Sequence, residues 1–497
     1  MKPGLKNFPK GPLPTNSIHC VRFFNEKDIK RFKTSKDYPR KPFADLSLSE
    51  REPVKSVRIV MAYDRVETLY FVRAGTKTFT LHEAIRKGFD FDSETTNTLA
   101  LDFSSISSGE AERALSAVTS LLVLAPYEPK KFGKKAAKKS EKKTTPEVLL
   151  KSSLSPARAN EVFERALSTS EASNLVRTLA ELPSNELRPE SYHLMAKAYA
   201  KEWGAKFEFF DRKALEKRGA GGFLAVVRAD ADHGYGIAKL TYRPSGQSSG
   251  RKIALVGKGL CFDTGGYNIK MGEYMLEMHR DMTGSAVALA TFGHLIRMGT
   301  KDHLECYLAL AENLISATAY RPNEVVVASN GVSIEVVDTD AEGRMALSDT
   351  LVLADEGKPD LIIDFATLTG AVMRAIDTRR SGVFSNRDEL RELAVAAGEA
   401  SGERVWGFPI GEDYWEAIQS DIADIRQCAT TNNADHIYAA TFLSRFVSPE
   451  TPWLHIDLAA ESHKGGLGLS AKDVTGYGVR LTSEILQRFR PKRREKK

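Results

Sequence analysis

Two short segments of this 497-residue chain concentrate charged side chains in a pattern that suits chemistry. The first, GKGLCFDTGGYNIK at 257–270, follows an apolar run and carries two lysines and an aspartate. The second, DTDAEGRMALSD at 338–349, carries several acids and an arginine, and a further aspartate lies between the two segments. Gathered in one place, such residues can hold metal ions and stabilise negative charge during hydrolysis. The candidates are Lys258, Asp263, Lys270, Asp281, Asp338, Asp340, Glu342 and Arg344.

Each of these residues, taken singly, also has an ordinary structural interpretation. Asp340 and Glu342 fit the start of a helix, where carboxylates interact favourably with the helix dipole. Asp263 precedes two glycines, as turn residues do. Lys258 can be a surface lysine after a strand, and the glycines beside it lack the spacing of a phosphate-binding loop. The chemistry therefore rests on the set as a whole.

Four of these five carboxylates, with no histidine among them, would repel one another if the fold brought them together. Two divalent cations balance four negative charges, and oxygen ligands suit Mg²⁺ and Mn²⁺ and are accepted by zinc. Carboxylates shared between two ions about 3.5–4 Å apart form a site that activates water. The set predicts a two-metal hydrolytic site.

Short strands alternating with helices are expected around these residues. Strands are predicted near 57–61, 69–72, 99–103, 121–124, 207–210, 223–227, 253–256, 306–310, 325–337 and 361–365, and helices near 159–180 and 284–299. This alternation indicates an α/β fold of two α/β domains. The C-terminal one is expected to have a mixed, largely parallel central sheet flanked by helices. Sites in such domains lie beyond the carboxyl ends of strands, where the candidates fall.

Composition divides the chain into an N-terminal domain (1–127), a lysine-rich loop with a linking helix (128–181), a catalytic domain (182–490) and a basic tail (491–497). Residues 130–143 hold eight lysines and one glutamate, so much of the net charge of +6 lies there and in the tail. The remaining chain is mildly acidic, unlike a basic nucleic-acid-binding domain. The lysine-rich stretch is expected to be a solvated loop, the alternative being an arm that contacts nucleic acid.

The cysteines and the N-terminus bear on the compartment. The four cysteines are scattered without a C-x-x-C pair, which favours a reducing environment. No apolar run approaches the roughly 20 residues of a membrane span. The acid-poor, basic start resembles a mitochondrial transit peptide, but its prolines oppose an amphipathic helix. We expect a cytoplasmic protein, with a mitochondrial location as the alternative.

The C-terminal domain resembles the leucyl aminopeptidase (cytosol aminopeptidase) family of metallopeptidases. The family signature N-T-D-A-E-G-R is DTDAEGR at 338–344. The glycine-lysine-glycine segment, the F-D-[ST]-G-G turn and the later lysine match 257–270, and ATLTGA at 366–371 also matches. The resemblance implies an exopeptidase that releases N-terminal, leucine-like residues from peptides and assembles as a homohexamer.

The resemblance also implies a role for each metal ligand. Asp263 and Glu342 bridge two divalent ions, with zinc, manganese, cobalt and magnesium as the candidates. Asp340 completes the more loosely bound site. Lys258 and Asp281 complete the tighter one, and Lys258 must bind as a neutral amine, which adjacent cations favour.

Two further residues are implied to act in catalysis without binding metal. Lys270 stays cationic and stabilises the oxyanion of the tetrahedral intermediate. Arg344 holds a bicarbonate ion that acts as the general base. The implied substrate-binding residues are Lys270, Met278, Asp338, Thr367, Leu368, Gly370 and Ala371. Ordinary core packing is the alternative for Met278 and Ala371.

The sequence departs from the family pattern in two places. Asp338 stands where the family usually has asparagine, which adds a negative charge beside the metals. Residues 426–443 replace a segment that is typically glycine-rich, and Asp435 and His436 are unexpected there. A metal-ligating role for His436 is the less favoured interpretation, since a lone histidine is more often structural. A phosphoesterase and a nucleic-acid-binding protein are the competing functions.

Overall fold

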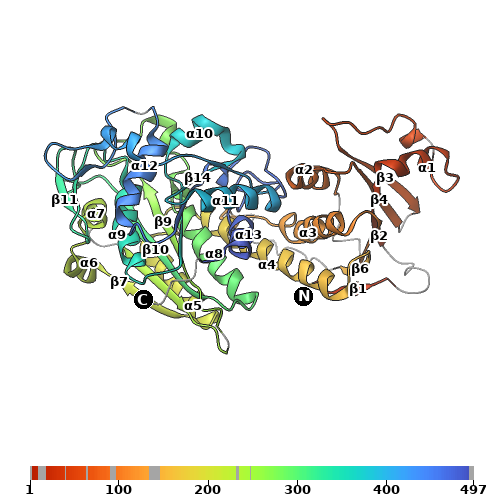
Figure 1. Ribbon diagram of the computed structural model, residues 1–497, viewed down its shortest axis with the longest axis horizontal. Helices are drawn as coiled ribbons and strands as arrows, with labels where there is room; N and C mark the ends of the chain where they lie inside the picture. Colours follow the sequence, from red (N-terminus) through yellow and green to blue (C-terminus); the bar gives the residue numbers. More distant parts are fainter. Residues whose placement is uncertain are drawn as a thin grey trace. The chain divides into compact units, whose positions relative to one another are not determined.

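The computed structural model describes residues 3–8, 18–39, 41–62, 65–89, 97–133, 146–230, 234–246, 248–431 and 433–491 (Figure 1). The chain divides into two compact units, Met1–Glu171 with Gly466–Ala471, and Ala172–Gly465 with Lys472–Lys497. Both are α/β, as the sequence predicts. In the described ranges, no helix has the length and apolar character to cross a membrane. Most of the lysine-rich stretch and nearly all of the basic tail lie outside these ranges, so nucleic-acid contact there stays a prediction.

The first unit is built on a six-stranded sheet of order β1-β6-β5-β2-β4-β3, in which only the β3–β4 pairing is antiparallel. Leu469, from the returning segment Gly466–Ala471, is 3% exposed in the core of this unit. Beside it, Nε of Arg86 donates to the main-chain oxygen of Gly468 at 2.9 Å. The elements are β1 (Leu5–Asn7), β2 (Ile18–Asn25), α1 (Ile29–Thr34), β3 (Val54–Ala62), β4 (Arg65–Val72), α2 (Thr78–Gly88), β5 (Thr98–Ser105), α3 (Ser108–Leu124), β6 (Glu147–Lys151) and α4 (Pro156–Ala180), which continues into the second unit.

Two of the strands predicted from sequence are wrong, and both segments are helical. Residues 121–124 form the last turn of α3, whose N-cap residue Ser107 forms a capping box with Glu110. Residues 223–227 fall largely in the short helix α7 (Gly221–Val226), which packs on α9 (Glu342–Asp355). Short apolar runs fit a buried helix as well as a buried strand, and periodicity cannot separate the two. The capping residues before 121–124 were the available helix signal.

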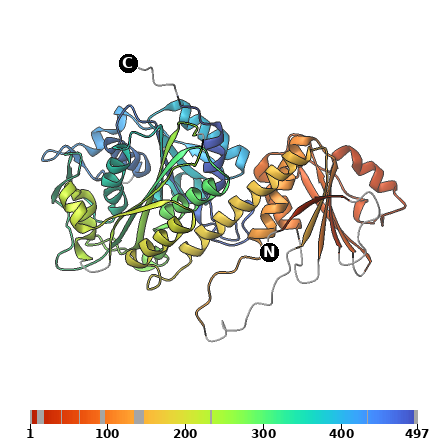
Figure 2. The same ribbon diagram turned by 90° about the horizontal axis from the view of Figure 1, so that it is seen from below.

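The second unit is built on an eight-stranded sheet of order β15-β14-β17-β13-β9-β10-β8-β7, with helices on both faces (Figure 2). Its four middle strands, β17, β13, β9 and β10, are parallel, so their carboxyl ends share one edge. The elements are α5 (Pro189–Glu202), β7 (Lys206–Phe210), α6 (Arg212–Arg218), α7, β8 (Gly236–Tyr242), β9 (Lys252–Asp263), α8 (Thr283–Arg297), β10 (His303–Asn313), β11 (Val325–Val327), β12 (Ser333–Glu335), α9, β13 (Leu361–Ala366), α10 (Gly370–Ile376), β14 (Ser381–Ser385), α11 (Asp388–Ser401), β15 (Val405–Gly407), β16 (Ile425–Arg426), α12 (Asp435–Leu443), β17 (Trp453–Asp457) and α13 (Val479–Arg488).

Glycines let the two central helices approach the sheet closely. A Cβ on Gly257 of β9 would lie 2.4 Å from Cα of Ser285 in α8. The next residue, Lys258, points to the opposite face, because side chains alternate along a strand. There a Cβ on Gly343 of α9 would lie 2.5 Å from Cε of Lys258. The helices α8 and α9 therefore cover opposite faces of β9 and β10, as Figure 1 shows.

Replacing Gly257 by alanine tests this close packing. The added methyl group would meet main-chain atoms of α8, which cannot move aside as a flexible side chain can. We expect a loss of about 1–3 kcal/mol in the free energy of unfolding, the usual cost of overpacking. Urea denaturation measures it. Gly411→Ala is the matched control, because nothing lies within 4 Å of that position; equal stability of the two variants would contradict the packing argument.

Candidate active site

The carboxyl edge of the eight-stranded sheet gathers the charged residues that the sequence singled out. β9 supplies Lys258 within its length and Asp263 as its last residue. The chain then turns back through Gly265 and Gly266, whose φ angles of +83° and +65° are left-handed. The turn is tight, since a Cβ on Gly265 would lie 2.9 Å from Oδ1 of Asp340.

Three carboxylates converge beside this turn. One oxygen from each of Asp263, Asp340 and Glu342 lies within 4.8 Å of the others. Asp263 and Glu342 are almost fully buried. Oε2 of Glu342 has no hydrogen-bond partner among the described residues, although buried polar atoms usually have one. A divalent cation, which takes carboxylate oxygens as ligands, fits this arrangement.

Lys258 enters the cluster from inside the sheet. Its Nζ lies 2.8 Å from Oδ2 of Asp281 and 3.0 Å from Oε1 of Glu342, and it donates to the main-chain oxygen of Thr367 at 2.9 Å. Burial alone would lower the pKa of Lys258, but the charges of Asp281 and Glu342 outweigh burial and raise it. In the metal-free protein Lys258 is therefore an ammonium ion, and it must lose a proton before it can bind a metal.

Lys270 neutralises the other side of the cluster. Its Nζ lies 2.8 Å from Oδ2 of Asp263 and 2.6 Å from Oδ1 of Asp340. Its main-chain N–H donates to the oxygen of Thr264 at 2.9 Å, which closes the turn that follows β9. Burial lowers the pKa of Lys270, but the surrounding carboxylates raise it on balance, so this side chain stays cationic.

The acids of the cluster hold their protons more tightly than isolated carboxyl groups do. Burial raises the pKa of Glu342 to about 8, and the charge of Asp263 adds to this effect. Burial also raises the pKa values of Asp281 and Asp340, each to about 6. The two lysines thus do not fully compensate the negative charge of the acids. Such an excess of negative charge favours the binding of metal ions.

Polar side chains that were not predicted from the sequence hold these acids and their loops in place through hydrogen bonds. Asn313, the last residue of β10, donates Nδ2 to Oδ1 of Asp263 at 2.8 Å and to the main-chain oxygen of Thr339 at 3.0 Å. The hydroxyl of Tyr320 donates to the same oxygen at 2.8 Å. Oγ1 of Thr339 donates to the oxygen of Gly265 at 2.7 Å. The position of Asn313 at a strand end was the available signal.

Asp457, the last residue of β17, was also missed, because no strand was predicted near 453–457. Its Oδ1 accepts the N–H of Leu368 at 3.0 Å, and its Oδ2 accepts the hydroxyl of Thr369 at 2.7 Å. These bonds hold the loop whose Thr367 accepts from Lys258 and donates Oγ1 to Oδ1 of Asp281 at 2.8 Å. Asp457 therefore acts through this loop on the Lys258–Asp281 pair.

The residues predicted to bind substrate lie in several elements of this unit. Met278 begins a 3-10 turn before Asp281 and is partly buried. Thr367 and Leu368 are partly buried after β13, and Gly370 and Ala371 form the first turn of α10, where Gly370 is exposed.

Asp338 and Arg344 flank Asp340 and Glu342, the two acids of the signature that join the cluster. Oδ1 of Asp338 accepts the N–H of Asp340 at 2.9 Å, a bond that an asparagine oxygen can also accept. The guanidinium of Arg344 is 2% exposed and donates to the main-chain oxygen of Gln427 at 3.1 Å and to the carboxylate of Asp435. The sequence predicted neither partner of Arg344.

His436 stands apart from the acidic cluster. Its ring packs on those of Phe408 and Phe384, with centroids 4.6 Å and 6.2 Å away. Burial lowers the pKa of His436. The group of described side chains that fits a metal ion contains carboxylates and no histidine.

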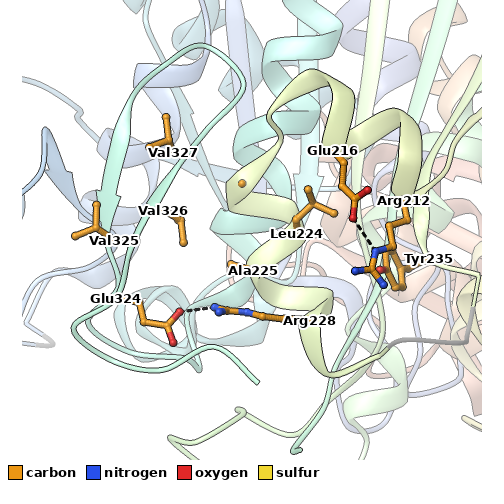
Figure 3. Close-up of a pocket in the computed structure, with 11 residues that line it drawn as sticks. Arg212, Glu216, Leu224, Ala225, Arg228, Tyr235, Glu324, Val325, Val326 and Val327 are labelled. Atoms are coloured by element: carbon orange, nitrogen blue, oxygen red, sulfur yellow. Dashed lines mark hydrogen bonds and ion pairs between the residues drawn. The ribbon is translucent and has the colours of Figure 1, made fainter. Parts of the chain in front are cut away.

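A separate pocket of about 450 Å³ opens between α6, α7 and the strand β11 (Figure 3). Arg228 and Glu324 point toward each other across it, and Arg212 pairs with Glu216 on one side. The predicted site residues are absent from its described lining.

Comparison with known proteins identifies the family. Residues 174–483 match the model of the cytosol aminopeptidase family, catalytic domain. The chain belongs to this family. A probable cytosol aminopeptidase of a Sulfurihydrogenibium strain is 36% identical over 376 residues, which cover 74% of this chain and 73% of that protein. Proteins of the same description from a Synechococcus strain and from Syntrophotalea carbinolica are 38% and 40% identical over 349 and 325 residues, covering 69% and 65% of this chain and 70% and 65% of the relatives.

The family prediction made from the sequence is therefore confirmed, and the protein is a peptidase. The matched range contains every residue that the sequence placed in the site, from Lys258 to Ala371.

Replacing Asp457 tests whether a residue outside the proposed ligand set affects metal binding by holding the 367–369 loop. Asp457→Asn removes the charge that anchors the 367–369 loop, so we expect metal affinity to fall by about 10–100-fold, as for other residues that orient metal ligands. Titration of the metal-free protein with Mn²⁺ measures it. The matched control is Asp360→Asn, because Oδ2 of Asp360 accepts the N–H of Lys252 at the opposite edge of the sheet. Unchanged affinity in Asp457→Asn would contradict the role.

The raised carboxyl pKa values predict that metal binding depends on pH. Glu342, with a pKa of about 8, is largely protonated at pH 7 and must lose this proton to bind an ion. The affinity for Mn²⁺ should therefore rise between pH 6 and pH 8, with protons released on binding. Calorimetry in two buffers of different ionisation enthalpy counts these protons. Glu403→Gln is the control, because burial also raises the pKa of Glu403 and the acids of the cluster are not among the causes of that shift. Constant affinity over this range would count against the prediction.

Proposed function

We propose that this chain is a metal-dependent aminopeptidase that releases N-terminal, leucine-like residues from peptides. The observation that carries the proposal is the buried convergence of Asp263, Asp340 and Glu342, with two lysines set against them. Family membership supports the same activity.

Two divalent ions, whether zinc, manganese, cobalt or magnesium, would be held by five side chains. Asp263 and Glu342 would be shared between the ions, Asp340 would complete one site, and Lys258 with Asp281 would complete the other. When bound, the ions would polarise the scissile carbonyl and activate water. The unpartnered Oε2 of Glu342 and the raised carboxyl pKa values support this assignment.

Lys270 is proposed to stabilise the negative charge that develops on the scissile carbonyl oxygen. The side chain of Lys270 is 15% exposed, so solvent reaches part of it while most of its surface is shielded. The contacts with Asp263 and Asp340 fix its position before substrate arrives, and a preorganised cation of this kind lowers the barrier of acyl transfer.

Arg344 is proposed to hold the anion that takes the proton from the attacking water. An arginine cannot itself accept a proton, so its contribution is to bind and orient the acceptor. The sequence resemblance assigns bicarbonate to this place. Burial lowers the pKa of Arg344, but the charge of Asp435 and, to a smaller extent, that of Glu342 raise it, which supports a role beside the cluster.

The preference for leucine-like residues is proposed to come from Met278, Leu368 and Ala371, which offer apolar surface. Thr367, Gly370 and Asp338 would contact the backbone of the substrate. Leu368 packs against the main apolar core of this unit, which supports an apolar pocket beside the metal ligands.

Homohexameric assembly and a cytoplasmic location also belong to the proposal. Five large apolar side chains around Lys270 are between 46% and 73% exposed, and clusters of this kind mark interaction surfaces. They are Tyr267, Ile269, Met271, Tyr274 and Leu276. The relatives' description as cytosol aminopeptidases supports the location.

One titration tests the activity. The protein is stripped of metal, Mn²⁺, Co²⁺ or Zn²⁺ is added back, and hydrolysis is followed for a leucine amide with a free or an acetylated amino group. We expect no turnover without metal, recovery on addition, and cleavage of the free-amine substrate alone. Turnover without metal, or equal cleavage of the acetylated substrate, would refute the proposal. Hydrolysis of phosphate esters with no leucine amide turnover would favour the phosphoesterase alternative.

A further inference from the structure

The guanidinium of Arg344 is a buried cation whose charge the chain itself compensates. Its side chain is 2% exposed, and Nη2 donates to Oδ1 of Asp435 at 2.9 Å and to Oδ2 at 3.0 Å. Burying a charged group is costly unless an opposite charge and hydrogen bonds accompany it. Asp435 supplies both to Nη2, and Nη1 donates to the main-chain oxygen of Gln427, while Nε has no hydrogen-bond partner among the described residues. The charge of Arg344 is thus paired within the protein by Asp435.

The segment that carries Asp435 is fastened to the signature loop. Oε1 of Gln427 accepts the N–H groups of Val337 and Asp338, each at 3.1 Å, and its Nε2 donates to the oxygen of Ala341 at 3.0 Å. The main-chain oxygen of Gln427 also accepts from Arg344. These bonds fix Gln427 against residues 337–344, and the guanidinium of Arg344 contacts both Gln427 and Asp435.

The helix that begins at Asp435 is held as well. α12 packs on α9 and on α10, which follows the 366–371 loop. Its second residue, His436, is buried and packs against the rings of Phe384 and Phe408. Asp435 itself keeps 24% of its side chain exposed, while Arg344 behind it is almost completely covered. The carboxylate is therefore the accessible member of the pair.

The other acids around the signature have different partners. Asp281 and Glu342 contact Lys258, and Asp263 and Asp340 contact Lys270. These four are the acids among the five proposed metal ligands. Among the described acids of the site, Asp435 is thus the one held by an arginine and left out of the ligand set.

We propose that Asp435 is the anion of Arg344, so that the enzyme uses its own carboxylate there and binds no bicarbonate. This inference rests on the proposed function, in which an anion at Arg344 accepts the proton of the attacking water. That proton converts the Asp435 carboxylate to a carboxyl group. It then passes to the leaving amine, which restores the carboxylate. Peptide and water give an amino acid and a shortened peptide, and no other reactant is consumed.

The first test uses the wild-type protein. Metal-free protein is titrated with ¹³C-labelled bicarbonate and followed by NMR, and the metal-loaded enzyme is assayed with a leucine amide in bicarbonate-free buffer, before and after bicarbonate is added. We expect no saturable binding and no change in rate. Saturable binding, or a rate that depends on bicarbonate, would overturn the inference.

Two substitutions distinguish Asp435 as a proton acceptor from Asp435 as a purely structural partner of Arg344. Asp435→Ala removes the carboxylate and leaves space, so we expect a loss on the order of 100-fold in rate, the lower range for general-base catalysis. Added bicarbonate or formate should restore part of the rate, and bicarbonate should now bind saturably. Asp435→Asn removes the charge but fills the space, so it should lose activity without rescue. Asp413→Ala, which changes an exposed acid of the same unit, is the control.

The outcomes are distinct. Loss in both variants without rescue or bicarbonate binding would show a structural pair and overturn the inference. If Asp435→Ala does not fold, the wild-type titration and Asp435→Asn still decide. Absence of leucine amide hydrolysis by the metal-loaded wild type would instead refute the proposed function.

Discussion

The burial of several carboxylates at the carboxyl edge of the sheet is the constraint on which the catalytic unit depends. Buried carboxylates are tolerated only when cations and hydrogen bonds compensate them. Lys258 and Lys270 each bridge two of the acids, yet burial still raises the pKa of Glu342 to about 8. The site is therefore electrostatically incomplete without further positive charge, and metal ions would relieve a cost that the fold already bears.

The backbone explains how such a site keeps its shape. Four parallel strands end at one edge, and side chains at or just after their ends, such as Asn313 and Asp457, hold loops instead of facing solvent. Gly257 and Gly343 let α8 and α9 approach Lys258 from opposite faces of the sheet. The acids are thus placed mainly by main-chain geometry, which tolerates little local adjustment.

Sequence patterns predicted this edge well because charged residues follow strand ends in a way that core packing does not require. The α/β class and most of the catalytic strands were also predictable, since long apolar runs such as β9 and β10 are distinctive. Residues 121–124 and 223–227 were not, because short apolar runs fit either a buried strand or a buried helix. The Arg344–Asp435 pair joins residues 91 positions apart, and the support by Asp457 depends on strand order. Neither has a local signature.

The short segment Gly466–Ala471 makes completion of the first unit depend on synthesis of most of the second. It belongs to the first unit, where Leu469 fills part of the core, although the catalytic sequence precedes it. During synthesis from the amino terminus, the first unit must wait for Leu469 until residues 172–465 of the second unit have been made. Its core is completed only after the described strands of the catalytic unit and all of its described helices except α13 have been made, so a domain that is translated early is finished late.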